Sequence, residues 1–140
     1  MIRRFGSKEG LVRTIVEVIG HEVRAQRDEA PPGDVPGAVR NLVEHYEEFG
    51  DMVLHLLRQE ERVAVLAEGS RVGRDFHAAW VERVFAQWLE SQAGVIRARR
   101  RAQLVAACDV QTWHLLRRQG GLSRRQTELA IIELLQGVLQ

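Results

Sequence analysis

The side chains in this sequence that could do acid–base, metal or nucleophilic chemistry are five histidines, four serines and one cysteine. His21-Glu22 begins like the His-Glu-x-x-His motif of zinc proteases, but position 25 is alanine, so the second metal ligand is missing. No histidine has an acidic residue three positions before it, as the ligand pairs of di-iron bundles require. No serine lies in a Gly-x-Ser-x-Gly turn, and no glycine-rich phosphate loop occurs. The motifs therefore predict no enzyme, no metal site and no cofactor.

One tyrosine, two histidines and two tryptophans could line a small-molecule cavity, because each of these side chains has an apolar ring and a polar N–H or O–H group. For any one of these residues, packing in the core with a hydrogen-bonded tip is the simpler interpretation. They recur, however, on the second, third and fourth predicted helices, which favours a shared cavity for a small, apolar ligand. The predicted lining residues are Tyr46, His55, His77, Trp80 and Trp88. Cys108 closes the apolar run Leu-Val-Ala-Ala-Cys, which predicts a buried and unreactive thiol.

The chain that must position these residues has 140 residues, of which 45% are hydrophobic and 28% are charged. These values predict one globular domain in a soluble protein. No apolar run approaches the roughly 18 residues that a membrane-spanning helix needs, and the amino end lacks a secretory signal. The formal net charge is +1, and a single cysteine suits a reducing compartment. We therefore expect a cytoplasmic protein without a membrane partner.

Hydrophobic residues recur at helical spacing along the whole chain and no segment alternates like a strand, so the predicted fold class is all-α. Asp34 precedes Pro36 and is the expected N-cap of a helix that Gly50 ends. Ser123 and Gln126 form a capping box for the last helix. The six predicted helices cover about residues 8–30, 35–49, 52–61, 73–91, 98–119 and 124–139. The fourth has a less regular start, from about residue 69.

The last two predicted helices are apolar on more than one side. The fifth is apolar almost all round over residues 104–110, and the last carries an apolar band wider than one core-facing stripe. A helix that is apolar all round needs two partners, and both helices lie near the C-terminal end of a small chain. We predict that the second partner is another copy of the chain, which makes the protein a homodimer.

Residues 1–12, which read MIRRFGSKEGLV, resemble the segment that ends the recognition helix in TetR-family transcriptional regulators. The family pattern reads aromatic, two variable residues, Phe, small residue, Ser or Asn, Lys, acidic residue, any residue, Leu. Ile2 stands where the family has Tyr. The residues that match are Phe5, Ser7, Lys8, Glu9 and Leu11. The long helix after this motif, the helical body and the C-terminal helix pair agree with the same family.

The resemblance implies a TetR-like helical bundle. Residues 1–7 would be a remnant of the recognition helix of a helix-turn-helix, and residues 8–140 would be the effector-binding and dimerisation domain. A three-helix DNA-binding head would precede Met1, so operator recognition is expected only where that head is present. The contacts expected with the DNA backbone, which position a protein without reading sequence, are those of Arg3, Arg4 and Lys8.

The resemblance further implies a homodimer whose C-terminal helices form a four-helix interface. The residues expected in that interface are Trp113, Leu116, Ile132 and Leu135. Ligand occupancy would change the spacing of two DNA-binding heads, so the implied function is that of a ligand-responsive transcriptional regulator, a repressor.

Two interpretations of different classes follow. In the first, the chain is a TetR-type regulator reduced mainly to its ligand-binding and dimerisation domain. In the second, it is a head-less helical dimer that acts as a protein-interaction or ligand-buffering module without binding DNA. An in-frame helix-turn-helix directly upstream of the Met1 codon favours the first, and a stop codon there favours the second. An enzyme is a distant third, because no acid–base or nucleophile constellation is recognisable.

Overall fold

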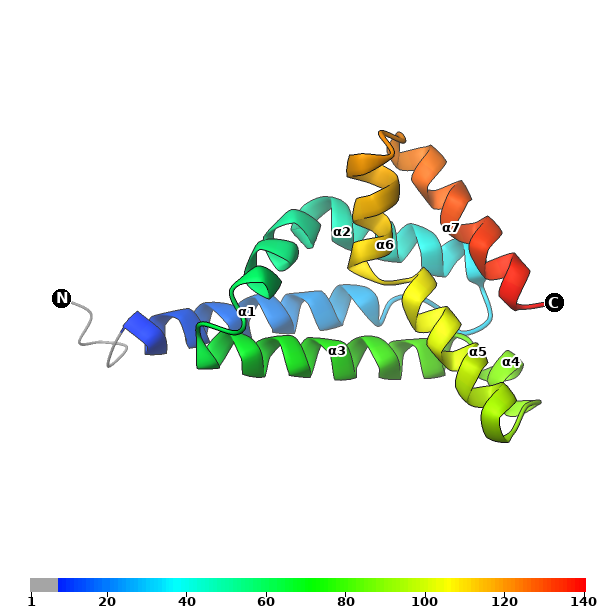
Figure 1. The fold of residues 1–140 in the computed structure, drawn as a ribbon, viewed down its shortest axis with the longest axis horizontal. Helices are drawn as coiled ribbons and strands as arrows, with labels where there is room; N and C mark the ends of the chain where they lie inside the picture. The colour runs from blue at the N-terminus through cyan, green and yellow to red at the C-terminus, as the bar shows by residue number, and fades with distance from the viewer. Residues whose placement is uncertain (1–7) are drawn as a thin grey trace.

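The computed structural model describes residues 8–140, and this part of the chain is helical and contains no strand (Figure 1), as the hydrophobic spacing predicts. Seven α-helices and one π-helical turn follow one another in this region. Their bounds are α1 Lys8–Arg27, α2 Val35–Arg58, α3 Ala64–Val84, α4 Ala86–Glu90, α5 Gly94–Ala107, α6 Val110–His114, η2 Leu115–Gln119 and α7 Arg124–Val138. Within the described residues, no helix is both long enough and apolar enough to cross a membrane.

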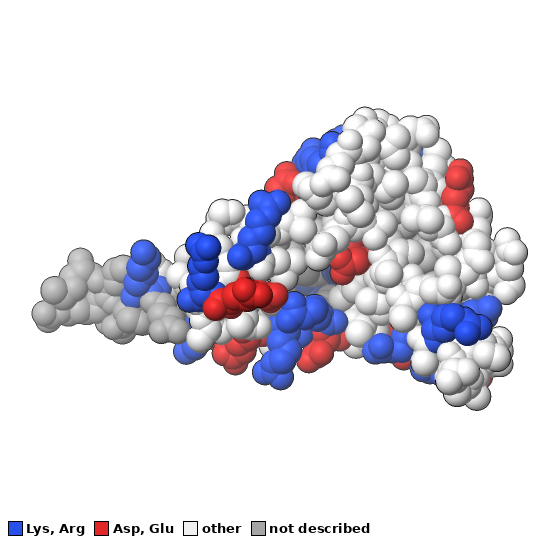
Figure 2. Space-filling model, viewed as in Figure 1, with Lys and Arg blue, Asp and Glu red and all other residues white. Residues whose placement is uncertain are grey.

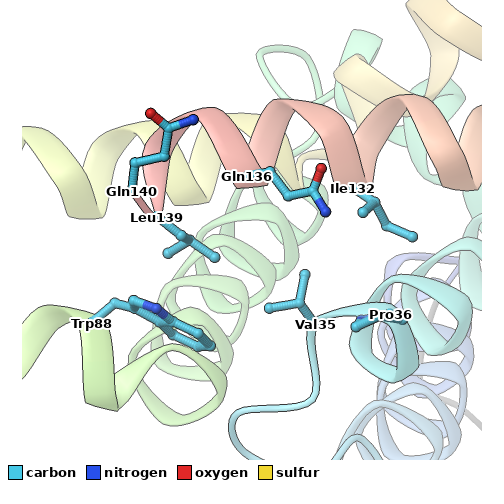
Figure 3. A pocket seen from close by; sticks show the side chains of 7 residues that line it. All are labelled: Val35, Pro36, Trp88, Ile132, Gln136, Leu139 and Gln140. Carbon is cyan, nitrogen blue, oxygen red and sulfur yellow. The ribbon is translucent and has the colours of Figure 1, made fainter.

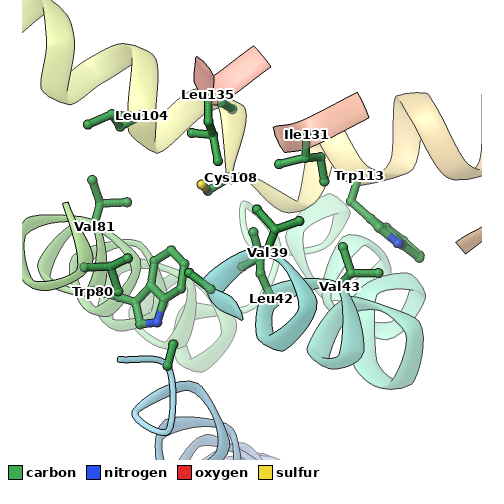
Figure 4. Close-up of a cluster of buried hydrophobic side chains, with 14 of the residues drawn as sticks. Val39, Leu42, Val43, Trp80, Val81, Leu104, Cys108, Trp113, Ile131 and Leu135 are labelled. Carbon is green, nitrogen blue, oxygen red and sulfur yellow. The ribbon is translucent and has the colours of Figure 1, made fainter. Parts of the chain in front are cut away.

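The helices pack around α2, which contacts α1 and α3 on one side and α6 and α7 on the other. In Figure 1, α1 and α3 lie side by side along the lower part of the molecule, and α2 curves above them. The hairpin formed by α6, η2 and α7 covers the far side of α2, and α5 leads from α3 and α4 up to this hairpin. Figure 4 shows the shared core, where Val39 and Leu42 of α2 lie close to Ile131 of α7.

The expected helix end at Gly50 is wrong, because α2 continues through this residue to Arg58. The start of α2 is as predicted: Asp34 is the N-cap, and its carboxylate accepts a hydrogen bond of 3.0 Å from the Gly37 amide. Gly50 lies instead where the indole of Trp113 packs against the helix. A Cβ atom at this position would lie 2.7 Å from Trp113 Cζ3. The glycine therefore provides space for a tryptophan and does not stop the helix.

Two helices that were predicted to be continuous are interrupted. The segment with Phe76 and Trp80 begins earlier than expected, at Ala64, and breaks at Phe85 before the short helix α4. The predicted helix 98–119 begins at Gly94 and breaks at Cys108 and Asp109. Side chains take up the backbone groups that this second break frees. The Tyr46 hydroxyl donates to the Cys108 carbonyl at 2.7 Å, and the Asp109 carboxylate accepts from the Gln111 amide at 2.9 Å.

The last hairpin forms as predicted at its turn. The chain leaves η2 at Gly120, and Gly121 has a φ of +70°, a conformation that glycine adopts without strain. Ser123 is then the N-cap of α7, and its hydroxyl accepts from the Gln126 amide at 3.1 Å. The hairpin buries Trp113, Ile131 and Leu135 against the body.

Candidate functional site

The most unusual feature of the core is a buried arginine at the end of α1. Arg27 is only 3% exposed, and no described acidic side chain forms an ion pair with it. Its guanidinium carbon lies 4.4 Å from the centroid of the Trp80 ring, and its Nη2 is 3.1 Å from Nδ1 of His77. The aromatic ring therefore stabilises a charge that has no ion-pair partner among the described residues.

These contacts determine which nitrogen of His77 carries hydrogen. Arginine stays protonated and offers only donors, so Nδ1 of His77 must accept the hydrogen bond. The hydrogen is then on Nε2, which donates to the Val105 carbonyl at 3.1 Å. Trp80 adds a third link, because its indole N–H donates to the carbonyl of Arg27 at 3.0 Å. The end of α1 is thereby fixed to α3 through both the side chain and the backbone of one residue.

Two further polar side chains, His45 and Tyr46 from α2, lie next to this group. Burial, and then the charge of Arg27, lower the pKa of His77 to about 4 and that of His45 to about 3. Burial raises the pKa of the Tyr46 hydroxyl and lowers that of Arg27. Both histidines are therefore neutral at pH 7, and the group carries one positive charge. We call this set the Arg27 cluster: Arg27, His45, Tyr46, His77 and Trp80.

The hydrogen-bonding capacity of the Arg27 cluster is only partly used. Nε of Arg27 and Nδ1 of His45 are both buried, and neither has a hydrogen-bond partner among the described residues. Buried polar atoms without partners are rare in native proteins, because no hydrogen bond compensates the free energy lost when they are removed from water. Two unused positions around one unpaired charge mark this cluster as a candidate binding site.

A groove opens beside the cluster, between the C-terminal half of α2, the middle of α3 and the segment α6–η2. It has a volume of about 480 Å³, and we call it the α2–α6 groove. Arg74 and Glu60 form an ion pair of 3.2 Å at this groove. The groove adjoins the Arg27 cluster at two places. Arg74, which lines the groove, lies one turn before His77 on α3, and Asp109 directly follows Cys108, whose carbonyl accepts from Tyr46. Its lining residues are Leu54, Leu57, Arg58, Glu60, Arg74, Asp109, Gln111, His114, Leu115 and Gln119.

A second groove lies at the other end of α2, where this helix begins beside α4 and the end of α7. It has a volume of about 550 Å³ and is more apolar. Figure 3 shows Trp88, Val35 and Leu139 pointing into this opening from three different elements. We call it the C-terminal groove.

The structure separates the five predicted ligand residues. Tyr46, His77 and Trp80 come together around Arg27 in the core. His55 is exposed on α2 and is hydrogen-bonded to Gln59, and Trp88 lines the C-terminal groove. None of the five lines the α2–α6 groove.

The sequence analysis missed Arg27, although a signal for it exists. The residue lies four positions after Val23, and therefore continues the apolar face of the first helix. A charged side chain on the buried stripe of an amphipathic helix is a position that needs a partner or a function.

The residues predicted for a dimer interface divide into two groups. Trp113 and Leu135 are fully buried within their own chain, while Leu116 and Ile132 are half-buried. The exposed large side chains of this hairpin are instead Leu115, which is 55% exposed, and Leu134, which is 48% exposed. Figure 2 shows few charged side chains on the surface over α6 and α7, whereas Lys, Arg, Asp and Glu are mixed over α1 and α3.

Of the residues expected to contact DNA, Arg3 and Arg4 lie outside the described residues. Lys8 is the exposed first residue of α1. Comparison with known proteins adds no relative: no family model, no curated protein and no solved structure matches the chain.

Proposed function

We propose that residues 8–140 are the ligand-binding and dimerisation domain of a TetR-type transcriptional regulator, a repressor. The observation that carries the proposal is the outer face of the α6–η2–α7 hairpin. This face has few charges and leaves Leu115 and Leu134 exposed, while its inner face is already packed on the body. Large exposed apolar side chains on neighbouring helices are typical of a protein–protein contact.

A second copy of the same hairpin is the partner we propose. Two hairpins related by a twofold axis would form a four-helix interface and remove Leu115 and Leu134 from water. The charges on the adjacent side of the hairpin are already paired within the chain. Arg117 binds Glu47 at 3.0 Å, and Arg118 binds Asp51 at 2.9 Å. Dimerisation through this face would therefore desolvate few unpaired charges.

The route from ligand to DNA would run through α3 and α1. In addition to the Trp80 bond, Arg83 of α3 donates to the Ala30 carbonyl at 2.7 Å, and the Gly33 amide donates to the Val84 carbonyl at 2.9 Å. The C-terminal end of α1 must follow any movement of α3. A ligand in the α2–α6 groove would touch α3 at Arg74 and so displace α1. The other end of α1, at Lys8, lies about 30 Å away by the rise of an α-helix and would carry the displacement towards DNA.

Sedimentation of the chain at micromolar concentration tests the dimer. We expect a dimer for the wild type and for Val95→Asp, a control at a 79% exposed residue on α5. Leu134→Asp should raise the dissociation constant at least about tenfold, because it places a charge in the proposed interface. A monomeric wild type, or equal effects of the two variants, would refute the proposed interface.

DNA binding is tested with the whole gene product, which includes any residues encoded upstream of Met1. This protein should select a short palindromic site from sheared genomic DNA, because a twofold dimer presents two equivalent heads. A dimer that selects no DNA sequence would leave the head-less module as the better description.

A further inference from the structure

The Arg27 cluster contains a buried positive charge and no anionic group. Arg27 is the only cation of the described core that is both almost completely buried and without an ion-pair partner. A buried charge is tolerated when an opposite charge and hydrogen bonds compensate it. Here the compensation comes from Trp80, Phe76 and one neutral histidine. None of these groups is an anion.

We propose that the Arg27 cluster binds the carboxylate of a small organic acid, whose apolar part lies in the adjoining α2–α6 groove. In this arrangement, Nε of Arg27 and Nδ1 of His45 donate to the carboxylate. Within the Arg27 cluster, these are the two buried nitrogens without a hydrogen-bond partner; Nη2 of Arg83 and Nδ1 of His114 are also unpartnered but lie outside the cluster. This inference rests on the proposed ligand-binding function and adds the chemical class of the ligand.

The charge balance favours a carboxylate over a phosphate. With His45 and His77 neutral, the five residues of the Arg27 cluster carry a single positive charge, which a carboxylate neutralises. Asp28 and Arg83, whose charges also act on Arg27, are of opposite sign. A phosphate group brings about −1.5 to −2 charges and would leave negative charge in the core. The guanidinium also lies against aromatic rings, with its carbon 4.4 Å from the Trp80 centroid and 5.7 Å from that of Phe76. Its donors point along the plane of the group, where a carboxylate receives them best.

The groove supplies the surroundings for the rest of the molecule. Leu54 and Leu57 of α2 give it an apolar wall. Asp109 lines the groove, and its carboxylate accepts from the Gln111 amide at the start of α6. Glu60 is paired with Arg74. Of these two acidic groups at the groove, Glu60 is in an ion pair, and Asp109 is engaged only with a backbone amide.

Matched pairs of probes test the proposal on the intact chain. Octanoate and octanamide have the same apolar body, and only the first carries a charge; phenylacetate and phenylacetamide form a second pair. We expect each acid to bind at least about tenfold more tightly than its amide, by calorimetry and by thermal shift, because the hydrogen bonds to the carboxylate are charge-assisted. The acids should also move the Nε–Hε resonance of Arg27 in NMR spectra, a readout that needs no variant. Sodium chloride at equal concentration is the control for an inorganic anion.

Two arginine variants then localise the site. Arg27→Met should lower the affinity for octanoate at least about tenfold while the protein stays folded, because it replaces an uncompensated charge by an apolar chain of similar length. Arg24→Met is the matched control. Arg24 is exposed one turn earlier and stacks on the same Phe76 ring at 5.8 Å, so its loss should leave the affinity within about twofold. Arg27→Lys keeps the charge without the planar fork and should bind octanoate with intermediate affinity.

The outcomes separate this proposal from the proposed function. Equal binding of acids and amides, a response to chloride alone, or no change at the Arg27 resonance with any acid would overturn the carboxylate site. Each of these results leaves the dimer and the DNA selection untouched. Acid binding that depends on Arg27 in a monomeric chain would support the site and refute the proposed regulator.

Discussion

The buried histidines of the Arg27 cluster should make the stability of the protein fall as the pH falls from 7.5 to 5. In the unfolded chain a histidine binds its proton near pH 6.5, whereas burial and Arg27 lower the folded-state pKa to about 4 for His77 and to about 3 for His45. Between these values the unfolded chain binds more protons than the folded chain. Stability from both groups is therefore fully present above about pH 6.5 and is lost towards the folded pKa values.

The magnitude follows from the linkage relation. At pH 5 each of the two histidines should have lost about 2 kcal/mol of stabilisation relative to pH 7.5, so the free energy of unfolding should fall by about 4 kcal/mol. His77→Gln should remove about half of this pH dependence, because glutamine can still accept from Arg27 and donate to Val105 but does not titrate. Carboxylates protonate mainly below about pH 5, which keeps this window free of their contribution.

Urea unfolding at a series of pH values, followed by tryptophan fluorescence, measures this dependence. The protein concentration must be held constant, because a dimer gains stability with concentration. His55→Gln is the matched control, since His55 is exposed on α2 and lies outside the cluster. A flat wild-type curve between pH 7.5 and 5, or an unchanged slope when both His45 and His77 are replaced by glutamine, would refute the assigned environment of the cluster.

Two further predictions concern local packing and capping. Gly50→Ala should destabilise the protein by about 1–3 kcal/mol in urea unfolding, because the added Cβ would lie 2.7 Å from Trp113 Cζ3. Gly73→Ala is its control in open space on α3 and should stabilise by about 0.5–1 kcal/mol; equal changes would exclude the packing explanation. Ser123→Ala should cost about 1 kcal/mol through loss of the α7 N-cap. Ser91→Ala removes a weaker hydrogen bond outside any N-cap, and an equally large loss there would contradict the capping role.

Local signals in the sequence predicted the all-α class and several helix ends correctly. The N-caps at Asp34 and Ser123 and the turn at Gly120-Gly121 each depend on a few adjacent residues, and the structure confirms them. The predicted helix end at Gly50 is wrong for the same reason. The role of this glycine is set by Trp113, a residue 63 positions away in the sequence, and no local pattern reports such a contact.

The wrong boundary at Gly50 also explains why the predicted ligand residues do not meet. Because α2 continues without a break, His55 lies nine residues after Tyr46, which is about two and a half turns of an α-helix. The two side chains therefore point in opposite directions, one into the core and one to solvent. The break at Phe85 likewise removes Trp88 from the row that contains Trp80. Spacing predicts shared faces only within one uninterrupted helix.

The break between α5 and α6 leaves the chain with an internal reporter of its own opening. Cys108 is the only thiol of the chain and is 1% exposed. It lies at the junction of α5 and α6, where the Tyr46 hydroxyl donates to its carbonyl. Burial raises its pKa to about 12, so the reactive thiolate is scarcely populated while the junction is closed. The rate of modification by a disulfide reagent therefore measures how often this part of the molecule opens, without any engineered label. A ligand that holds α2 against α6 would slow that reaction at a single, known atom.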